Sequence, residues 1–338
     1  LFGDVPEAVA WYGDWLGHLP GDDYWKRPGY NLSAFVNQYP AVPIFFVGGW
    51  YDHLQRPFLR AYGNLTRATG APTRMVSGPW VHGGSRGGGS KHGQVDFGSE
   101  ADLRHVVLAE RWMARWLKGE QGGADDPPVR IFVMGTGDGR KTAEGRLFHG
   151  GTWRDEPVWP LLRAVPTRFY LHAGGRLSTD LPPTSEPSGY AYDPRDPVPT
   201  VFTRAGGGWD QRCSRAYVHC RDELPLAARP DVLVFRTAPL TEPREVTGPI
   251  SVTFYASTDA PDTDFAFKLV DEYPASPDFP NGFSLILVDG LIRARYRDGY
   301  DRPALLESGQ VYEFTLELPP TSNLFKRGHR IRLDVASS

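Results

Sequence analysis

The 338-residue sequence has few cysteines, no long hydrophobic run and little excess of either charge. Its two cysteines, Cys213 and Cys220, are too few for a disulfide framework and do not fix a redox compartment. They could pair across a short loop or remain two free thiols. No apolar run approaches the roughly 18–20 residues that a helix needs to cross a bilayer, so no membrane segment is expected. With 37 basic and 40 acidic side chains, the net charge of −3 gives no electrostatic basis for binding nucleic acid.

Glycine, proline and aromatic residues are abundant instead. The 38 glycines and 31 prolines predict many turns, and the aromatic share of 13% predicts a β-rich fold with large packed rings. The length favours two domains, or one domain with a large appendage. The chain starts at Leu1 and ends just after a strand-like run at residues 330–335, so we expect both ends to continue in a longer protein.

Residues 1–40 are rich in aromatic side chains and have an early stretch of helical spacing. We favour mutual packing of the rings over an aromatic wall above a pocket, because rings that cluster in sequence are usually core residues. The rings concerned are Trp11, Tyr12, Trp15, Tyr24, Trp25 and Tyr30.

Residues 42–77 predict a strand–helix–strand unit. The apolar run at residues 42–47 is typical of a strand covered on both faces, and residues 74–77 form a second short strand. Between them, a stripe of Phe58, Leu59, Tyr62 and Leu65 predicts a helix that begins near Arg56 and ends at Gly70. The two strands should lie parallel, joined by a right-handed crossover.

The next segments predict a glycine-rich loop at residues 83–93 and then a helix. Ser99 is expected to cap this helix, which ends at Gly119. Its expected buried face consists of Leu103, Val106, Val107, Met113, Trp116 and Leu117.

From residue 129 onward, short β-branched and aromatic runs alternate with Gly, Pro and Asp clusters, without a convincing amphipathic helix. This pattern is typical of an antiparallel β-sandwich or jelly roll. The predicted strands are residues 129–134, 167–172, 232–236, 250–256, 265–270, 285–288, 291–296, 311–318 and 331–335.

Two polar side chains follow the paired strands at the point where each strand ends. Asp52 follows the first strand and His82 follows the second. Because the carboxyl ends of neighbouring parallel strands meet at one sheet edge, both side chains should emerge within hydrogen-bonding reach. A carboxylate that holds one imidazole nitrogen leaves the other to act as a general base, and a structural ion pair is the alternative.

Several segments carry a family resemblance in the same order along the chain. They are VPIFFVGGWYD at residues 42–52, GPWVHG at 78–83, RWLKG at 115–119, PVRIFVMG at 128–135, WP at 159–160, DVLVFRTAPL at 231–240, DTDF at 262–265 and GHRIRL at 328–333. The first two are similar to the acid and base segments of the CocE/NonD hydrolases, a family that includes esterases, acylases and X-Pro dipeptidyl peptidases. The resemblance covers most of the chain.

The resemblance implies an α/β-hydrolase lobe followed by a jelly-roll β-sandwich. Residues 1–40 would end a helical cap and return to the sheet, residues 41–145 would form the C-terminal part of the lobe, and residues 146–338 the jelly roll. In such hydrolases the triad runs Ser, acid, His along the chain, so Asp52 and His82 would be acid and base, with the nucleophile upstream of Leu1. The implied reaction is hydrolysis of a small ester, amide or short peptide through an acyl-enzyme, without a cofactor.

Partners and an alternative function follow from the same features. The first strand should be buried on both faces, so we expect the missing N-terminal segment, or a separate chain, to cover it, and a homo-oligomer stays open. The alternative class is a non-catalytic binding or scaffold protein that uses the jelly-roll domain. The sequence leaves the substrate and the compartment open.

Other candidate residues carry weaker signals. Ser85 lies in a GSRG segment without the strand and helix of a nucleophile elbow, and Ser77 should be buried in its strand. Trp50 and Trp80 flank Asp52 and His82, and either line an acyl pocket or brace the loops. No metal site is expected, because His82, His92 and His105 lack ligand spacing and the acidic group of Asp259, Asp262 and Asp264 lacks that of a calcium loop. A GTGDG segment at residues 135–139 does not fit the dinucleotide-binding spacing and is expected to be a loop or turn.

Overall fold

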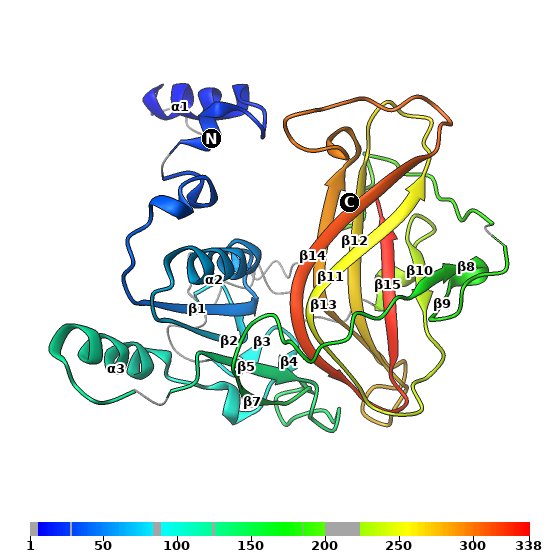
Figure 1. Ribbon diagram of the computed structural model, residues 1–338. Helices are drawn as coiled ribbons and strands as arrows, with labels where there is room; N and C mark the ends of the chain where they lie inside the picture. The colour runs from blue at the N-terminus through cyan, green and yellow to red at the C-terminus, as the bar shows by residue number, and fades with distance from the viewer. Residues whose placement is uncertain (1–5, 28, 84–88, 124–125, 185, 200–223) are drawn as a thin grey trace.

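The computed structural model describes residues 6–27, 29–83, 89–123, 126–184, 186–199 and 224–338 (Figure 1). Cys213, Cys220 and Ser85, for which the sequence raises questions of pairing and chemistry, lie outside the described residues.

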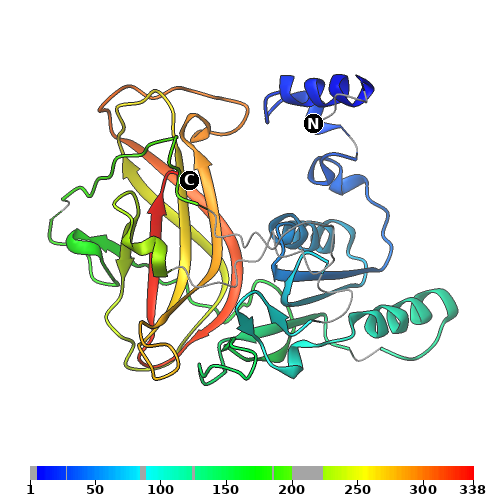
Figure 2. The same cartoon turned by 180° about the vertical axis from the view of Figure 1, so that it is seen from behind.

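The N-terminal segment begins at the top of both views and descends toward the first sheet (Figures 1 and 2). It contains α1 (Pro6–Gly17) and the short 3₁₀ helices η1 (Asp23–Lys26), η2 (Leu32–Ala34) and η3 (Val36–Gln38). Its aromatic rings contact one another, with centroids 4.2 Å apart for Trp11 and Trp15 and 5.6 Å apart for Trp15 and Trp25. Mutual packing is therefore confirmed, but Trp11 stays 49% exposed and these rings do not belong to the buried core.

The predicted strand–helix–strand unit is confirmed as β1 (Ile44–Tyr51), α2 (Gln55–Thr69) and β2 (Thr73–Val81). The strands are parallel, with Ile44 opposite Thr73. Helix α2 buries Leu59, Tyr62 and Leu65 of its predicted stripe. A Cβ atom on Gly49 would lie 2.1 Å from the carbonyl oxygen of Trp80, so only glycine permits the strands to approach this closely at their ends.

The helix after the glycine-rich loop differs from its prediction at both its start and its buried face. Ser99 begins the 3₁₀ turn η5 (Ser99–Ala101), and α3 (His105–Lys118) starts one turn later without a side-chain cap. The buried residues of α3 are Leu108 and Trp112, and Leu108 packs with Trp80. The reason is that apolar residues occupy more than one face of this helix, so periodicity did not single out the face in contact. Five residues that were expected to be buried are instead 40–78% exposed: Val106, Val107, Met113, Trp116 and Leu117.

Among the residues that the structure describes, the strands form three sheets (Figure 1). The first has the order β1-β2-β5-β14-β11, with β7 also paired to β5, and the second has the order β13-β12-β15-β10-β9-β8. A small third sheet has the order β3-β4-β6. The bounds are β3 (Lys91–His92), β4 (Val95–Asp96), β5 (Val129–Met134), β6 (Leu147–Phe148), β7 (Gly151–Glu156), β8 (Tyr170–His172), β9 (Arg176–Ser178), β10 (Leu233–Arg236), β11 (Arg244–Ala256), β12 (Asp264–Tyr273), β13 (Phe283–Arg293), β14 (Tyr312–Phe325) and β15 (Arg330–Ala336), with 3₁₀ turns η6 (Ala173–Gly175), η8 (Leu224–Ala228) and η9 (Ala294–Tyr296).

The two large sheets pack face to face across a core of aromatic rings. Phe254 and Phe314 come from the first sheet and contact Phe265 of the second, with ring centroids 5.1–5.2 Å apart. Along β14, buried and exposed residues alternate, as in a strand with one face on a core. The prediction of antiparallel, sandwich-like packing in this half is confirmed by the long pairs β11–β14 and β12–β13.

The first sheet crosses the expected boundary between the two halves of the chain. Strand β5 pairs in parallel with β2 through Val129–Ile131 and, at Met134 and Asn323, with β14, while β7 pairs antiparallel along its whole length. The side chain of Gln55, at the start of α2, also donates to the carbonyl oxygen of Pro320 in β14. The C-terminal strands therefore hold the end of the α/β unit at which Asp52 and His82 emerge.

Candidate functional site

The site is built where β1 and β2 end side by side. Asp52 directly follows β1, and the turn after the strand is closed by its backbone N–H, which donates to the carbonyl of Gly49 at 3.2 Å. The carboxylate of Asp52 accepts a hydrogen bond of 2.8 Å from the backbone N–H of Leu54. This contact orients the carboxylate toward the end of the neighbouring strand.

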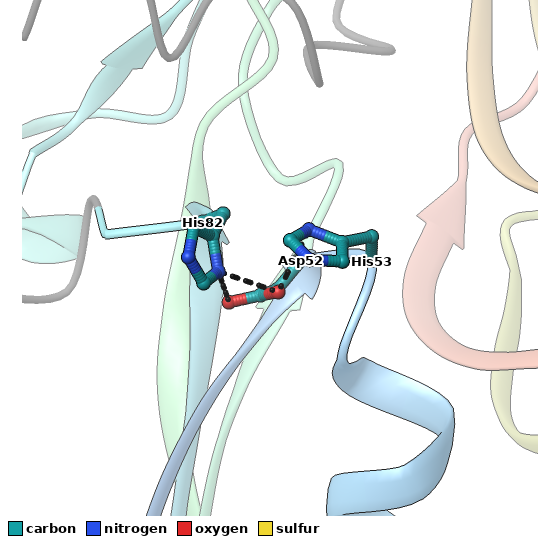
Figure 3. Close-up of side chains that lie close together, drawn as sticks. All are labelled: Asp52, His53 and His82. Atoms are coloured by element: carbon teal, nitrogen blue, oxygen red, sulfur yellow. Dashed lines mark hydrogen bonds and ion pairs between the residues drawn. The ribbon is translucent and has the colours of Figure 1, made fainter. Parts of the chain in front are cut away.

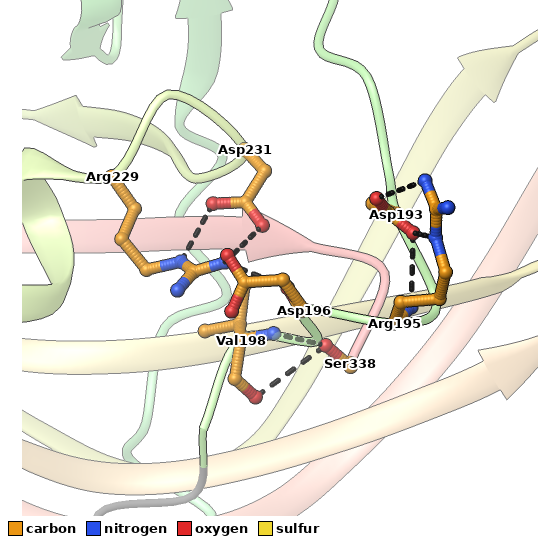
Figure 4. A network of polar contacts seen from close by, with 7 residues as sticks. All are labelled: Asp193, Arg195, Asp196, Val198, Arg229, Asp231 and Ser338. Atoms are coloured by element: carbon orange, nitrogen blue, oxygen red, sulfur yellow. Dashed lines mark hydrogen bonds and ion pairs between the residues drawn. The ribbon is translucent and has the colours of Figure 1, made fainter.

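His82 directly follows β2 and meets this carboxylate. Its Nδ1 atom lies 3.2 Å from Oδ1 and 3.3 Å from Oδ2 of Asp52 (Figure 3). The Asp52 side chain is 18% exposed and the His82 side chain 48% exposed, so the carboxylate lies beneath a more accessible imidazole. The structure thus brings together the two residues that the topology predicted to meet.

This contact has a chemical consequence. A carboxylate that accepts from Nδ1–H holds the imidazole in one orientation and in the tautomer whose Nε2 atom can accept a proton. The pair can therefore act as an orienting carboxylate and a general base.

The two flanking tryptophans belong to the interior. Trp50 is 2% exposed and donates its indole N–H to the carbonyl of Phe132 at 2.8 Å. Trp80 is fully buried and donates to the carbonyl of Ala101 at 3.0 Å. Of the two alternatives that the sequence leaves open for Trp50 and Trp80, substrate binding and bracing of the loops, this burial and these backbone hydrogen bonds favour bracing.

Sequence reasoning did not single out His53, which lies next to the pair. Its Nδ1 atom is 3.6 Å from Oδ1 of Asp52, and its ring centroid is 4.5 Å from that of His82. Its position directly after Asp52 was the available signal, because a residue in this turn stays at the strand end.

The remaining candidates occupy structural positions. Ser77 is fully buried in β2, as predicted. Asp262 and Asp264 form ion pairs with Arg295 and Arg293, both at 2.6 Å. The GTGDG segment forms an irregular loop after β5, with a bend at Gly137, which agrees with the prediction of a loop or turn.

A separate polar cluster lies in the interior between the sheets. His149 is fully buried, and its Nε2 atom is 2.9 Å from Oδ1 of Asn323, while its Nδ1 atom faces the hydroxyl of Tyr273. Asn323 donates to Asp271 at 3.1 Å, and Nδ1 of His329 is 2.7 Å from the same carboxylate. Burial lowers the pKa of His149 to about 4 and raises the pKa of Tyr273 well above its ordinary value, so both groups are neutral at pH 7.

A cleft of about 740 Å³ lies between α2 and the strands β13 and β14. Arginines dominate its lining, and Glu317 pairs with Arg56 at 3.2 Å and with Arg60 at 2.6 Å. These ion pairs tie α2 to β14 and support the junction below the site.

An α/β unit whose parallel strands end in a carboxylate–imidazole pair is the arrangement that serine hydrolases use to activate their nucleophile. Two family models agree with this class. The X-Pro dipeptidyl-peptidase C-terminal non-catalytic domain matches residues 122–338, and the X-Pro dipeptidyl-peptidase (S15 family) matches residues 1–84. The chain belongs to this family of X-Pro dipeptidyl-peptidase-like, CocE/NonD hydrolases, as the sequence resemblance indicated.

Individual relatives support the assignment. The cocaine esterase of Rhodococcus sp. (strain MB1 Bresler) is 35% identical over 350 residues, which cover 98% of this chain and 54% of the esterase. A solved aminopeptidase from a marine sediment Thaumarchaeota archaeon has a TM-score of 0.84 at 26% identity, over 99% of this chain and 53% of that one. A solved α-amino acid ester hydrolase has a TM-score of 0.82 at 29% identity, over 98% and 54% of the two chains. The chain thus spans about half the length of these relatives.

Within the described part of the chain, helices are too short or too polar to traverse a lipid bilayer.

Proposed function

We propose that this chain supplies the acid and the base of a Ser-His-Asp triad in a serine hydrolase, with the nucleophile in a segment outside the chain. Asp52 is the acid and His82 the base. The observation that carries the proposal is the hydrogen bond from His82 to Asp52 at the ends of two parallel strands. Residues 41–145 would belong to an α/β-hydrolase lobe, and residues 146–338 to a jelly-roll domain.

In the proposed reaction, Nε2 of His82 accepts the hydroxyl proton of the serine as its oxygen attacks the carbonyl carbon of the substrate. The negative charge of Asp52 stabilises the imidazolium that forms. His82 then returns the proton to the leaving alcohol or amine, which departs and leaves an acyl-enzyme. A water molecule, deprotonated by the same nitrogen, hydrolyses the acyl-enzyme and restores the serine.

The substrate class we propose is a small ester, amide or short peptide. The similar proteins include enzymes named for ester substrates and for peptide substrates, since one is named a cocaine esterase and another an aminopeptidase. The shared chemistry is transfer of an acyl group to water, which needs the same base and acid whether an alcohol or an amine leaves.

A test compares variants of the protein that includes the nucleophile segment, assayed with p-nitrophenyl esters and aminoacyl p-nitroanilides. His82→Ala should lower kcat by several orders of magnitude and leave the thermal unfolding midpoint nearly unchanged, because the side chain is half exposed on a loop. His18→Ala is the matched control, since His18 is a partly exposed histidine paired with Asp22 at 3.0 Å in the N-terminal segment. Equal turnover in both variants would overturn the proposal.

A second candidate function is a binding or scaffold role for the C-terminal domain. The family model that matches residues 122–338 describes a domain that is non-catalytic, which favours such a role for this part of the chain. A fluorophosphonate probe separates the two. Labelling of a serine in the protein with its nucleophile segment supports the hydrolase, and absence of labelling supports the binding role.

A further inference from the structure

Three side chains with metal-binding atoms converge at the strand ends. Oδ1 of Asp52 lies 3.2 Å from Nδ1 of His82 and 3.6 Å from Nδ1 of His53. The three donor atoms all lie within 4.8 Å of one another (Figure 3). Among the described residues, this is the group of three or more histidine, cysteine, aspartate or glutamate side chains that converges closely enough to share one ion.

We propose that Asp52, His53 and His82 form a binding site for a divalent transition-metal ion of the Zn²⁺ class. Two imidazoles and one carboxylate are a donor set that Zn²⁺ takes, with the fourth position open to water or another ligand. The donor set favours Zn²⁺, Co²⁺ or Cu²⁺ over Ca²⁺ and Mg²⁺, which prefer oxygen ligands.

The spacing of the donors fits this ion. Bonds of about 2.0–2.1 Å in a tetrahedral site place neighbouring donors about 3.3–3.4 Å apart. The two donor–donor distances to Asp52, 3.2 and 3.6 Å, lie on either side of that value. The donor atoms of the two imidazoles lie within 4.8 Å of each other, so a small rotation of the rings can bring them to the same spacing. Both rings can turn for this, because their side chains are 44% and 48% exposed.

The local backbone supports the arrangement. Asp52 and His53 are consecutive residues in the turn after β1, and His82 follows β2, so the ligands come from two neighbouring strand ends, with Tyr51 opposite Val81. The hydrogen bond from the N–H of Leu54 holds the shared carboxylate in place.

Metal binding would change the role of His82; this consequence rests on the proposed function. An ion on Nδ1 replaces the hydrogen bond to Asp52 and leaves the ring proton on Nε2, the atom that the proposed reaction uses as a base. A bound ion therefore blocks proton transfer from the serine, and a chelator that removes the ion restores it.

The binding experiment uses the full chain with Cys213→Ser and Cys220→Ser, so that thiolates cannot take the metal. Co²⁺ is added as a spectroscopic probe and Zn²⁺ is titrated by calorimetry. We expect one equivalent to bind, with the visible absorption of tetrahedral cobalt. His53→Ala and His82→Ala should each weaken binding at least about tenfold.

His18→Ala is the control for removal of a histidine beside carboxylates. The two nitrogens of His18 face different carboxylates, Asp22 at 3.0 Å and Asp14 at 3.6 Å, so the three cannot enclose one ion. The affinity of the His18→Ala variant for Zn²⁺ should equal that of the unchanged chain. Equal affinity in His53→Ala, or no bound cobalt in the unchanged chain, overturns the proposed site.

The inhibitory consequence is read separately, as ester turnover by the protein with its nucleophile segment. Zn²⁺ should lower turnover reversibly, and His53→Ala should raise the inhibiting concentration at least about tenfold. Equal inhibition of His53→Ala and the unchanged protein overturns the assignment of His53. A metal-free protein without turnover contradicts the proposed function instead, and the cobalt and calorimetric results still decide the site.

Discussion

The buried imidazole of His149 makes the stability of this fold sensitive to acid. The side chain lies between the two large sheets, with Tyr273 on one ring nitrogen and Asn323 on the other. Burial lowers its pKa from 6.5 to about 4, although the nearby Asp271 carboxylate and the Asn323 hydrogen bond both act in the opposite direction. His329 and Lys326 add smaller contributions that lower it further. We predict that replacing His149 with a residue that does not titrate removes part of the acid sensitivity.

The direction in which the unfolding free energy changes with pH depends on which state, folded or unfolded, binds more protons. Between pH 6.5 and about 4, the unfolded chain protonates this histidine while the folded chain keeps it neutral, so stability falls as the pH falls. The contribution is fully present above pH 6.5 and is lost on approach to pH 4. At about 1.4 kcal/mol per pKa unit, the loss is about 3 kcal/mol. His92, which burial also shifts to a pKa of about 4, adds a loss of similar size.

The assay is urea unfolding followed by tryptophan fluorescence at pH 7.5, 5.5 and 4.5. His149→Gln keeps a polar side chain in the cluster, and it should reduce the fall in unfolding free energy between pH 7.5 and 4.5 by about 2–3 kcal/mol, because pH 4.5 lies just above the folded-state pKa of about 4. Each variant is compared with the unchanged chain by its fall in unfolding free energy with pH, so a lower stability at pH 7.5 does not affect the result. His92→Gln should reduce the fall by a similar amount. The double variant should reduce it by about the sum, while His105, whose pKa burial also lowers, keeps its own contribution.

His18→Gln provides the control, because His18 lies in the exposed N-terminal segment. This variant should keep most of the fall in unfolding free energy that the unchanged chain shows between pH 7.5 and 4.5. The reasoning is refuted if His149→Gln loses as much unfolding free energy between pH 7.5 and 4.5 as the unchanged chain does.

Three further predictions concern the site, the core and the surface. Asp52→Asn should lower kcat about 10³–10⁴-fold in the protein with its nucleophile segment, measured by ester turnover, because the amide stabilises the wrong tautomer of His82; a loss below tenfold contradicts the triad. Phe314→Ala removes a fully buried ring and should lower the unfolding free energy by about 3–5 kcal/mol in urea; a loss below 1 kcal/mol contradicts the described core. Leu117→Lys should change the unfolding free energy of this chain by less than about 0.5 kcal/mol, because Leu117 is 78% exposed; a loss of 2 kcal/mol or more would mean that the helix buries this face.

The α/β unit and its site could be predicted because their signals are local. An apolar run, a helical stripe and a terminating glycine define β1 and α2, and parallel pairing then brings Asp52 and His82 to one edge. Predicting the contact between Asp52 and His82 requires only the topology of the two strands.

The misassigned features depend on the partners of a side chain, which periodicity does not contain. Helix α3 is apolar on more than one face, so its periodicity does not show which face is buried. In the structure, Leu108 packs against Trp80 and is buried, whereas Leu117 is exposed. Trp50 and Trp80 flank the site in sequence, yet their indoles turn inward to distant carbonyl groups. His53 lacked a signal of its own, and its contact with Asp52 depends on the turn that follows β1. The division of the chain at residue 145 stays a prediction.

The pairing of β5 with β14 also sets an order of events during synthesis. Met134 and Asn323, which meet in the first sheet, are separated by roughly 190 residues. At ribosomal rates of about 5–20 residues per second, the Met134 end of β5 waits about 10–40 s for β14. The rest of β5 pairs earlier, because β2 is already made and pairs with Val129–Ile131, and β7, made about 20 residues later, pairs along the other edge. Completion of this sheet is therefore a late event, because β14 joins it only after this interval.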